Sequence, residues 1–177
     1  MKDSVRSHSI TNRQGKRTRQ EMTETLTVRP AVETDVDNIR ALLTEYAQEH
    51  LLLGRTREDI LEKLKNFRVG ETDGEFVCCL ALRHYGDNLY EVRSLAVKKN
   101  WVNRGIGSKL VSGAVEHLRK QGIAARVFAL TYRAHFFCRL GFHIVDKEMF
   151  PQKIWSDCAI CAKKDQCDET AVLLEIQ

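Results

Sequence analysis

A glycine-containing loop between a predicted strand and a predicted helix constrains this chain more than any other segment. The stretch NWVNRGIGSKLV, residues 100–111, places Gly105 and Gly107 directly before a helix with regularly spaced apolar residues. Glycines let the backbone curl until successive N–H groups converge, and the positive end of the helix dipole faces the same point. This combination favours an anion such as a phosphate. The full G-x-G-x-x-G and G-x-x-x-x-G-K-[ST] signatures are absent, so the loop alone also fits a plain turn.

The hydrophobic pattern around this loop predicts a mixed sheet flanked by helices. Apolar runs predict strands at 26–31, 67–71, 75–85, 89–97, 125–130, 143–147 and 170–176. Two amphipathic helices are expected before the second strand, one capped by Thr34 and one capped by Thr56. A third helix follows the loop and ends at Gly122, and a short one covers 133–140. The order β-α-α-β-β-β-α-β-α-β-β belongs to the α/β (α+β) class.

The formal net charge of +4 is confined to the N-terminal end of the chain. Residues 1–21 hold six Lys or Arg against two acidic residues, whereas residues 22–177 are balanced. This basic leader lacks hydrophobic periodicity, so we expect it to be disordered. It fits a nucleic-acid-binding arm or a transit sequence, but we favour a true start at Met22 with the leader not translated. We therefore expect a single domain, 22–177, that binds no nucleic acid.

The cysteines and the length of the apolar runs indicate in which cellular compartment the protein resides. No run approaches the ~20 apolar residues that cross a bilayer, and no secretory signal core is visible. Free thiols are then expected in place of a disulfide framework, which predicts a cytoplasmic protein without a membrane partner. We expect Cys78, Cys79 and Cys138 to lie in the core.

A Cys-containing segment, 151–170, holds Cys158, Cys161 and Cys167 in C-x2-C-x5-C spacing. Structural zinc sites take four ligands, so this spacing is only partial. The remaining ligand would have to come from Asp157, Asp168 or His143. A pair of buried or redox-active thiols is the simpler interpretation, and we assign no metal.

The loop and its flanks together resemble the GNAT (Gcn5-related N-acetyltransferase) superfamily. EVRSLAV precedes the loop, FFCRLGFHIVD follows about thirty residues later, and the likeness extends over 26–177. The resemblance implies a GNAT fold, a mostly antiparallel sheet of six or seven strands in which strands four and five splay apart. It also implies acetyl-CoA as cosubstrate, with its pyrophosphate in the glycine loop.

By this resemblance, the main chain of Leu95, Ala96 and Val97 holds the pantetheine and the acetyl carbonyl. The pyrophosphate is wrapped by the loop residues Val102, Asn103, Arg104, Gly105, Ile106, Gly107 and Ser108. The family's leading Gln or Arg falls on Val102, which supplies no charge, and Arg104 is the expected substitute. The backbone cradle does not depend on that side chain.

The resemblance implies two catalytic residues, Glu91 and Ser94, on the strand before the loop. Family members use a Glu at this place as a base, directly or through water, and the alternative for Glu91 is a solvent-facing strand position. The family's acid, a Tyr, is replaced by Phe137, which we group with the coenzyme-binding residues. The acid is left open among Ser94, Thr131, Tyr132 and water, and Ser94 also fits a filler at a tight strand crossing.

Four stretches are similar to short, kinase-less amino-acid N-acetyltransferases, which resemble the acetyltransferase part of N-acetylglutamate synthase. They are LLLGRT, YEVRSLAV, FALTYRAHFFCRLGF and FPQKIWSDCAICAKKDQCDETAV. This likeness implies direct acetyl transfer, in a ternary complex, to the α-amine of glutamate, the first step of arginine biosynthesis. A dicarboxylic acceptor needs cationic side chains, and Arg binds carboxylates through a planar fork. The candidate acceptor-binding residues are Arg55, Arg93, Arg133 and Lys153.

Two other functions stay open. The same chemistry could act on another amino acid, a polyamine or a protein N-terminus, because a fold does not define an acceptor. A non-catalytic CoA- or metal-binding regulatory module would instead use the Cys-containing segment. Glu91 and the intact loop favour the enzyme, since a binding module needs no base. A homodimer also stays open, because no motif specifies the oligomeric state.

Overall fold

The computed structural model describes residues 25–150 and 166–177. Within these residues one seven-stranded sheet carries four α-helices. The elements, in chain order, are β1 (Leu26–Pro30), α1 (Val36–Gln48), α2 (Arg57–Glu62), β2 (Phe67–Thr72), β3 (Glu75–His84), β4 (Leu89–Val97), α3 (Ile106–Lys120), β5 (Ala125–Thr131), α4 (Ala134–Cys138), β6 (His143–Val145) and β7 (Thr170–Ile176). Their order is the predicted one. None of these helices is long and apolar enough to cross a membrane.

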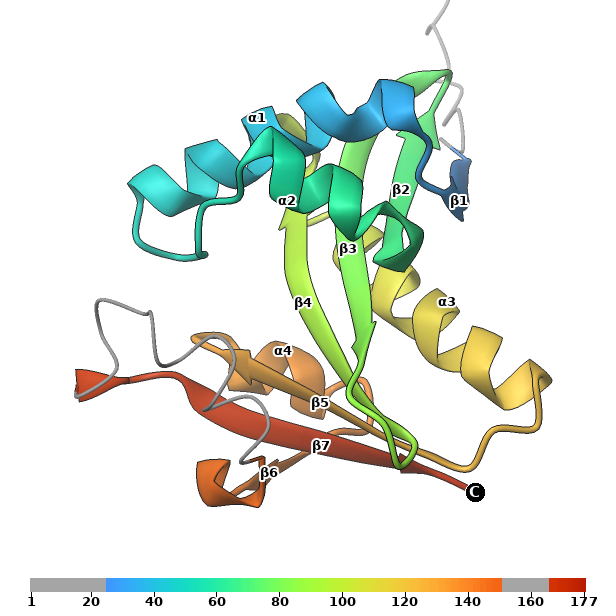
Figure 1. Cartoon of the computed structure of the whole chain (residues 1–177), viewed down its shortest axis with the longest axis vertical. Helices are drawn as coiled ribbons and strands as arrows, with labels where there is room; N and C mark the ends of the chain where they lie inside the picture. Colours follow the sequence, from blue (N-terminus) through green and yellow to red (C-terminus); the bar gives the residue numbers. More distant parts are fainter. Residues whose placement is uncertain (1–24, 151–165) are drawn as a thin grey trace, which may run out of the picture.

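The sheet is mixed, with a single parallel pair among the described strands. The order is β1-β2-β3-β4-β5-β7-β6, and only β4 and β5 run parallel. Their pairing is short, from Leu89 opposite Arg126 to Glu91 opposite Phe128. Beyond that point β4 and β5 diverge like the arms of a V (Figure 1). The predicted mostly antiparallel sheet with splayed fourth and fifth strands is therefore confirmed.

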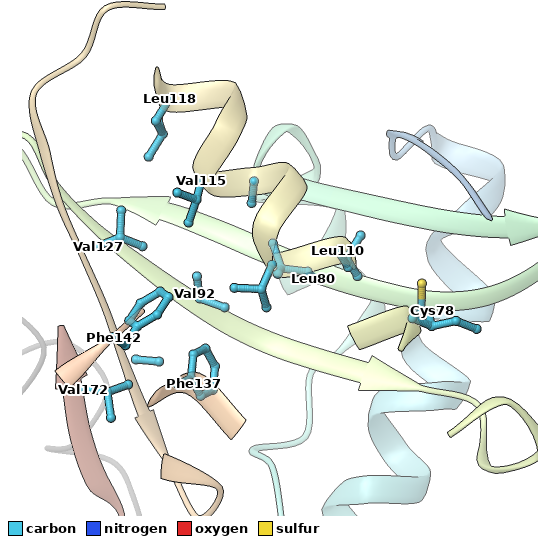
Figure 2. Close-up of a cluster of buried hydrophobic side chains, with 14 of the residues drawn as sticks. Cys78, Leu80, Val92, Leu110, Val115, Leu118, Val127, Phe137, Phe142 and Val172 are labelled. Carbon is cyan, nitrogen blue, oxygen red and sulfur yellow. The ribbon is translucent and has the colours of Figure 1, made fainter. Parts of the chain in front are cut away.

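One face of the sheet is covered by α3 and α4. The apolar stripe of α3 recurs at helical spacing, and Leu110, Val115 and Leu118 are all buried. Figure 2 shows these side chains directed toward the sheet, and Val92 and Val127 belong to the same cluster. Burying one such side chain fully contributes about 1.5–3 kcal/mol, so this face is a main source of stability.

The opposite face is covered by α1 and α2 (Figure 1). Ile39 and Leu43 of α1 and Ile60 of α2 are buried against strand residues such as Val69. A smaller cluster lies further along the same sheet, and in it Phe128 stacks on Phe150 with ring centroids 4.0 Å apart. Helices on both faces thus hold β4 in place while its far end separates from β5.

Two of the three predicted helix boundaries are confirmed. The Thr56 hydroxyl accepts the N–H of Asp59 at 3.1 Å and caps α2, and Gly122, with φ +66°, follows the end of α3. The prediction for Thr34 is wrong, because this residue lies inside a 3-10 turn, Glu33–Asp35, that precedes α1. Asp35 takes the capping role in that turn, since its buried carboxylate accepts the N–H of Val32 at 2.8 Å.

Candidate functional site

A cleft of about 590 Å³ lies where β4 and β5 diverge. The end of β4, the glycine loop with the start of α3, and the end of β5 with α4 form most of its wall, and residues of α1, of the loop after α1 and of the segment before β7 complete it. The strand residues in its wall are Val92, Arg93, Ser94, Leu95, Ala96 and Val97 from β4, and Ala129, Leu130 and Thr131 from β5. The predicted coenzyme-binding strand end and the glycine loop therefore share one site.

A β-bulge at Ser94 shapes the β4 wall. Cys79 of β3 pairs with Ala96 and Ala81 pairs with Arg93, so β4 has one more residue than β3 between these pairs. Ser94 has φ +51°, a left-handed conformation that is uncommon for a residue other than glycine. Its carbonyl accepts a hydrogen bond from the Cys79 thiol at 3.6 Å. A bulge bends and twists its strand, so the main chain that follows Ser94 is redirected along the cleft.

The glycine loop opens the N-terminus of α3 toward the same cleft. Gly105 has φ +76° and stands at the N-cap of a 15-residue helix, and Asn103 has φ +62°. The first N–H groups of a helix have no partner within it, so they are available to an anion. Gly107 lies beside the Phe136 ring, and a Cβ added to Gly107 would lie 3.5 Å from the nearest ring atom. The predicted loop residues that line the cleft are Val102, Asn103, Gly105, Ile106, Gly107 and Ser108.

Arg104 differs from its neighbours in the loop because it does not line the cleft. Its guanidinium carbon lies 4.7 Å from the ring centroid of Trp101. Trp101 is nine-tenths buried and is a cleft residue, and among the described residues its Nε1 has no hydrogen-bond partner. Arg104 is thus held by an aromatic face at the entrance of the loop.

Glu91 is buried, with 2% of its surface exposed, so the solvent-facing interpretation is wrong. Its Oε2 accepts the Tyr85 hydroxyl at 2.8 Å and lies 3.5 Å from Nη1 of Arg93. Glu91 itself does not line the cleft, but Arg93 does. The Glu91 carboxylate is therefore linked to the cleft by its contact with Arg93, two residues further along the strand.

The predicted cationic residues are only partly brought together. Arg93 and Arg133 line the cleft, and Arg139 of the turn after α4 joins them without having been predicted. Arg55 does not line it; its Nη1 lies 3.2 Å from Oδ2 of Asp59, one helical turn ahead. Lys153 lies outside the described residues. Among the described residues, the cleft wall thus holds three arginines and one carboxylate, Glu169.

Several hydroxyl groups share the cleft with Phe137. Ser94, Thr131 and Tyr132, which were considered as acids, all line it. Tyr46 of α1 was missed, because in the sequence it reads as part of an apolar helical stripe. Its hydroxyl donates to the carbonyl oxygen of Val97 at 2.7 Å, and burial raises the pKa of Tyr46. The other cleft residues missed from sequence are Leu51, Leu52, Val92, Trp101, Ala129, Leu130, Phe136, Arg139 and Glu169.

The cysteines separate into two environments. Cys78 and Cys79 are buried as predicted, and burial raises the pKa of Cys78 to about 12, so it stays a thiol. The prediction for Cys138 is wrong, because it is exposed at the end of the short helix α4. Cys158 and Cys161 lie outside the described residues. Within residues 25–150 and 166–177 no group of three or more His, Cys, Asp or Glu could hold a metal ion.

Comparisons with known proteins identify the family to which this site corresponds. A family model described as acetyltransferase (GNAT) family matches residues 34–142. An uncharacterized N-acetyltransferase of Chlorobaculum tepidum is 41% identical over 152 residues, which cover 81% of this chain and 97% of that protein.

Two further similarities concern longer proteins. The amino-acid acetyltransferase of Shewanella oneidensis is 32% identical over 128 residues, covering 71% of this chain and 28% of that protein. A structure of N-acetylglutamate synthase from Neisseria gonorrhoeae, complexed with coenzyme A and N-acetyl-glutamate, superposes with a TM-score of 0.76 at 24% identity. It is matched over 86% of this chain and 35% of that chain, and it shows the shared fold. This chain therefore spans about a third of the length of these two proteins.

Proposed function

The chain belongs to the acetyltransferase (GNAT) family, and we propose that it transfers the acetyl group of acetyl-CoA to the α-amine of an amino acid, glutamate being the acceptor. One observation carries this proposal. The open N-terminus of α3 and the redirected end of β4 share a cleft with Arg93 and Arg133. The first two features suit a phosphate-containing thioester, and the arginines suit a carboxylate.

Acetyl-CoA would occupy the wall formed by β4 and the glycine loop. Its pyrophosphate oxygens would accept hydrogen bonds from the backbone N–H groups of loop residues 102–108, where the helix dipole favours negative charge. The pantetheine would run beside the main chain of Leu95, Ala96 and Val97, with Phe137 against it. Arg104, fixed on Trp101, would supply the charge that Val102 does not.

The acetyl group would pass directly to the acceptor amine in a ternary complex. The amine attacks the thioester carbonyl, and the tetrahedral oxyanion is stabilised by main-chain N–H groups of β4. Glu91 would take the proton of the amine through a water, since its carboxylate is buried behind Arg93. The leaving thiolate would be protonated by Ser94, Thr131, Tyr132 or water.

The charge of the cleft favours an acidic acceptor over a polyamine. In the part of the chain that the structure describes, three arginines and one carboxylate, Glu169, line the wall, so a cationic substrate would be repelled. Arg93 and Arg133 are the proposed anchors for the two carboxylates of glutamate. Arg55 remains a proposed anchor, because it closely follows Leu51 and Leu52 of the cleft wall. Lys153 is a fourth proposed anchor. Acetylation of glutamate would place the protein in arginine biosynthesis, in the cytoplasm.

Release of the CoA thiol across a panel of acceptors tests the proposal. The panel holds glutamate, aspartate, glutamine, spermidine and a short peptide with a free N-terminus. We expect kcat/KM with glutamate to be at least tenfold above that with glutamine, spermidine or the peptide, because losing one bidentate ion pair costs about 1.4 kcal/mol or more. Aspartate keeps both carboxylates and tests the reach of the acceptor site. Equal turnover with spermidine would contradict an acidic acceptor. Binding of CoA without turnover on any amine would favour the regulatory module.

A further inference from the structure

Tyr85, the residue directly after β3, is held in place from several directions. The guanidinium carbon of Arg83 lies 4.5 Å from the centroid of its ring, and the ring packs against Phe128 at 5.9 Å. Its backbone N–H donates to the carbonyl of Leu89 at 2.9 Å and closes the hairpin between β3 and β4. The phenol is therefore fixed before it makes its own hydrogen bond.

That hydrogen bond goes to the buried carboxylate of Glu91. The Tyr85 hydroxyl donates to Oε2 at 2.8 Å, which is shorter than the 3.5 Å from Nη1 of Arg93 to the same oxygen. Buried carboxylates require such donors, and a hydrogen bond to an ionised group is about twice as strong as one between neutral groups. Tyr85 therefore contributes more than the longer Arg93 contact to the orientation of this oxygen.

The orientation of Glu91 is passed on to the cleft. Residues two apart in a strand share a face, so Glu91 and Arg93 emerge on the same side of β4. Glu91 has 3% of its side chain exposed and Arg93 has 11%, and Arg93 reaches the cleft wall. A line of contacts thus runs from the fixed phenol through the carboxylate to a cleft arginine.

We propose that Tyr85 is a positioning residue for acetyl transfer, acting through Glu91 and Arg93. This inference rests on the proposed function and deepens it, because it assigns a role to a residue outside the cleft. Removal of the hydroxyl leaves Glu91 with a weaker set of donors and lets its carboxylate turn away from Arg93.

A double-mutant cycle tests this role. Tyr85→Phe keeps the ring between Arg83 and Phe128 and removes only the hydroxyl. The matched control is Tyr90→Phe, since Tyr90 precedes Glu91 on the opposite face of β4 and stacks on His84 at 4.5 Å. Each variant, together with Glu91→Gln and the double variant Tyr85→Phe/Glu91→Gln, is assayed for kcat and for both KM values. Binding of CoA by calorimetry checks that each variant is folded.

We expect Tyr85→Phe to lower kcat roughly tenfold, the size of one charge-assisted hydrogen bond, with the KM for acetyl-CoA within about twofold of wild type. Tyr90→Phe should leave kcat within about twofold. The double variant should be no slower than Glu91→Gln alone, because both changes break one line of contacts.

Two results would overturn the inference. One is a Tyr85→Phe enzyme as fast as Tyr90→Phe. The other is a double variant in which the two single losses multiply in full, because Tyr85 would then act independently of Glu91. These results are distinguishable from a failure of the proposed function. In that case the wild-type protein itself would release no CoA thiol with any amino acid.

Discussion

The Tyr46 hydroxyl donates a 2.7 Å hydrogen bond to the carbonyl oxygen of Val97 and so joins the last turn of α1 to the last residue of β4. The chain that leaves α1 carries Leu51 and Leu52 into the cleft wall. One bond thereby connects the strand end proposed to hold the coenzyme with the segment that covers the cleft. Tyr46 is on the cleft wall itself, and burial raises its pKa, so the phenol stays protonated and able to donate at neutral pH.

Tyr46→Phe should raise the KM for acetyl-CoA about three- to tenfold. The substitution leaves the Val97 carbonyl without its donor, and one neutral hydrogen bond contributes about 0.5–1.5 kcal/mol. Steady-state kinetics with acetyl-CoA varied measures the effect, and Tyr90→Phe serves as the control for loss of a tyrosine hydroxyl. An unchanged KM would show that this bond does not hold the end of β4 for the coenzyme.

Gly105→Ala should weaken coenzyme binding without a steric clash. Among the described residues beyond its two chain neighbours, no atom lies within 4 Å of the position of the added Cβ. The cost is therefore conformational, since φ +76° is unfavourable by about 1–2 kcal/mol for a residue with a side chain. We expect either a rise of about five- to thirtyfold in the dissociation constant of CoA or an equivalent loss of stability.

Gly113→Ala is the matched control for Gly105→Ala. Gly113 lies within α3, also has open space around its Cβ position, and has an ordinary helical φ. Alanine there should raise the free energy of unfolding by about 0.5–1 kcal/mol and leave CoA binding unchanged. If both variants bound CoA as the wild type does, the left-handed start of α3 would not matter for the coenzyme.

The alternation and spacing of apolar residues predicted every strand and α-helix of the described fold, but not the short 3-10 helices between them. These signals are local: the stripe of α3 and the runs of β3 and β4 are determined by which side chains must be buried. The divergence of β4 and β5 was expected from family resemblance only. Nothing in the pairing pattern of a single strand indicates where its neighbour separates from it.

The site was predictable where it depends on main chain and was less so where it depends on side chains from other elements. The glycine loop and the end of β4 lie together as expected, because a strand, loop and helix in sequence are adjacent in space. Tyr46 and Arg139 were missed because their approach to the cleft depends on how α1 and α4 pack. Arg55 was expected in the wall, but its nearest described partner is Asp59, a turn away in sequence.

Arg133→Lys should impair acceptor binding selectively. Lysine keeps the charge but loses the planar fork that grips a carboxylate, so we expect the KM for glutamate to rise about tenfold. The KM for acetyl-CoA should stay within about twofold, since the loop and the end of β4 are untouched. Arg126→Lys is the control, because Arg126 is exposed on β5 and does not line the cleft. Parallel rises in both KM values would indicate a distorted cleft and contradict a role in acceptor recognition.

Asp35→Asn should destabilise the fold in a pH-dependent way. Arg29 donates to both Asp35 oxygens, at 2.7 Å and 2.9 Å, and this bonding lowers the pKa of Asp35. A carboxyl whose pKa is lower in the folded than in the unfolded state, where it is about 3.9, stabilises the fold above that pH. The stabilisation is lost as pH falls below about 4 and through the folded-state pKa, because the carboxylate then takes up a proton.

Urea unfolding of wild type and Asp35→Asn at pH 7 and near pH 3 measures this contribution. We expect a difference in the free energy of unfolding of about 1–3 kcal/mol at pH 7, since Arg29 is partly exposed and its ion pair partly screened. The difference should shrink at the lower pH, because the carboxyl of the unfolded wild-type chain, with a pKa of about 3.9, is then mostly protonated, and that protonation favours unfolding. Asp73→Asn, in the exposed β2–β3 turn with φ +52°, should change stability by no more than about 0.5 kcal/mol at either pH. A difference for Asp35→Asn that stayed constant with pH would assign its effect to packing and leave the Arg29 ion pair without a stabilising role.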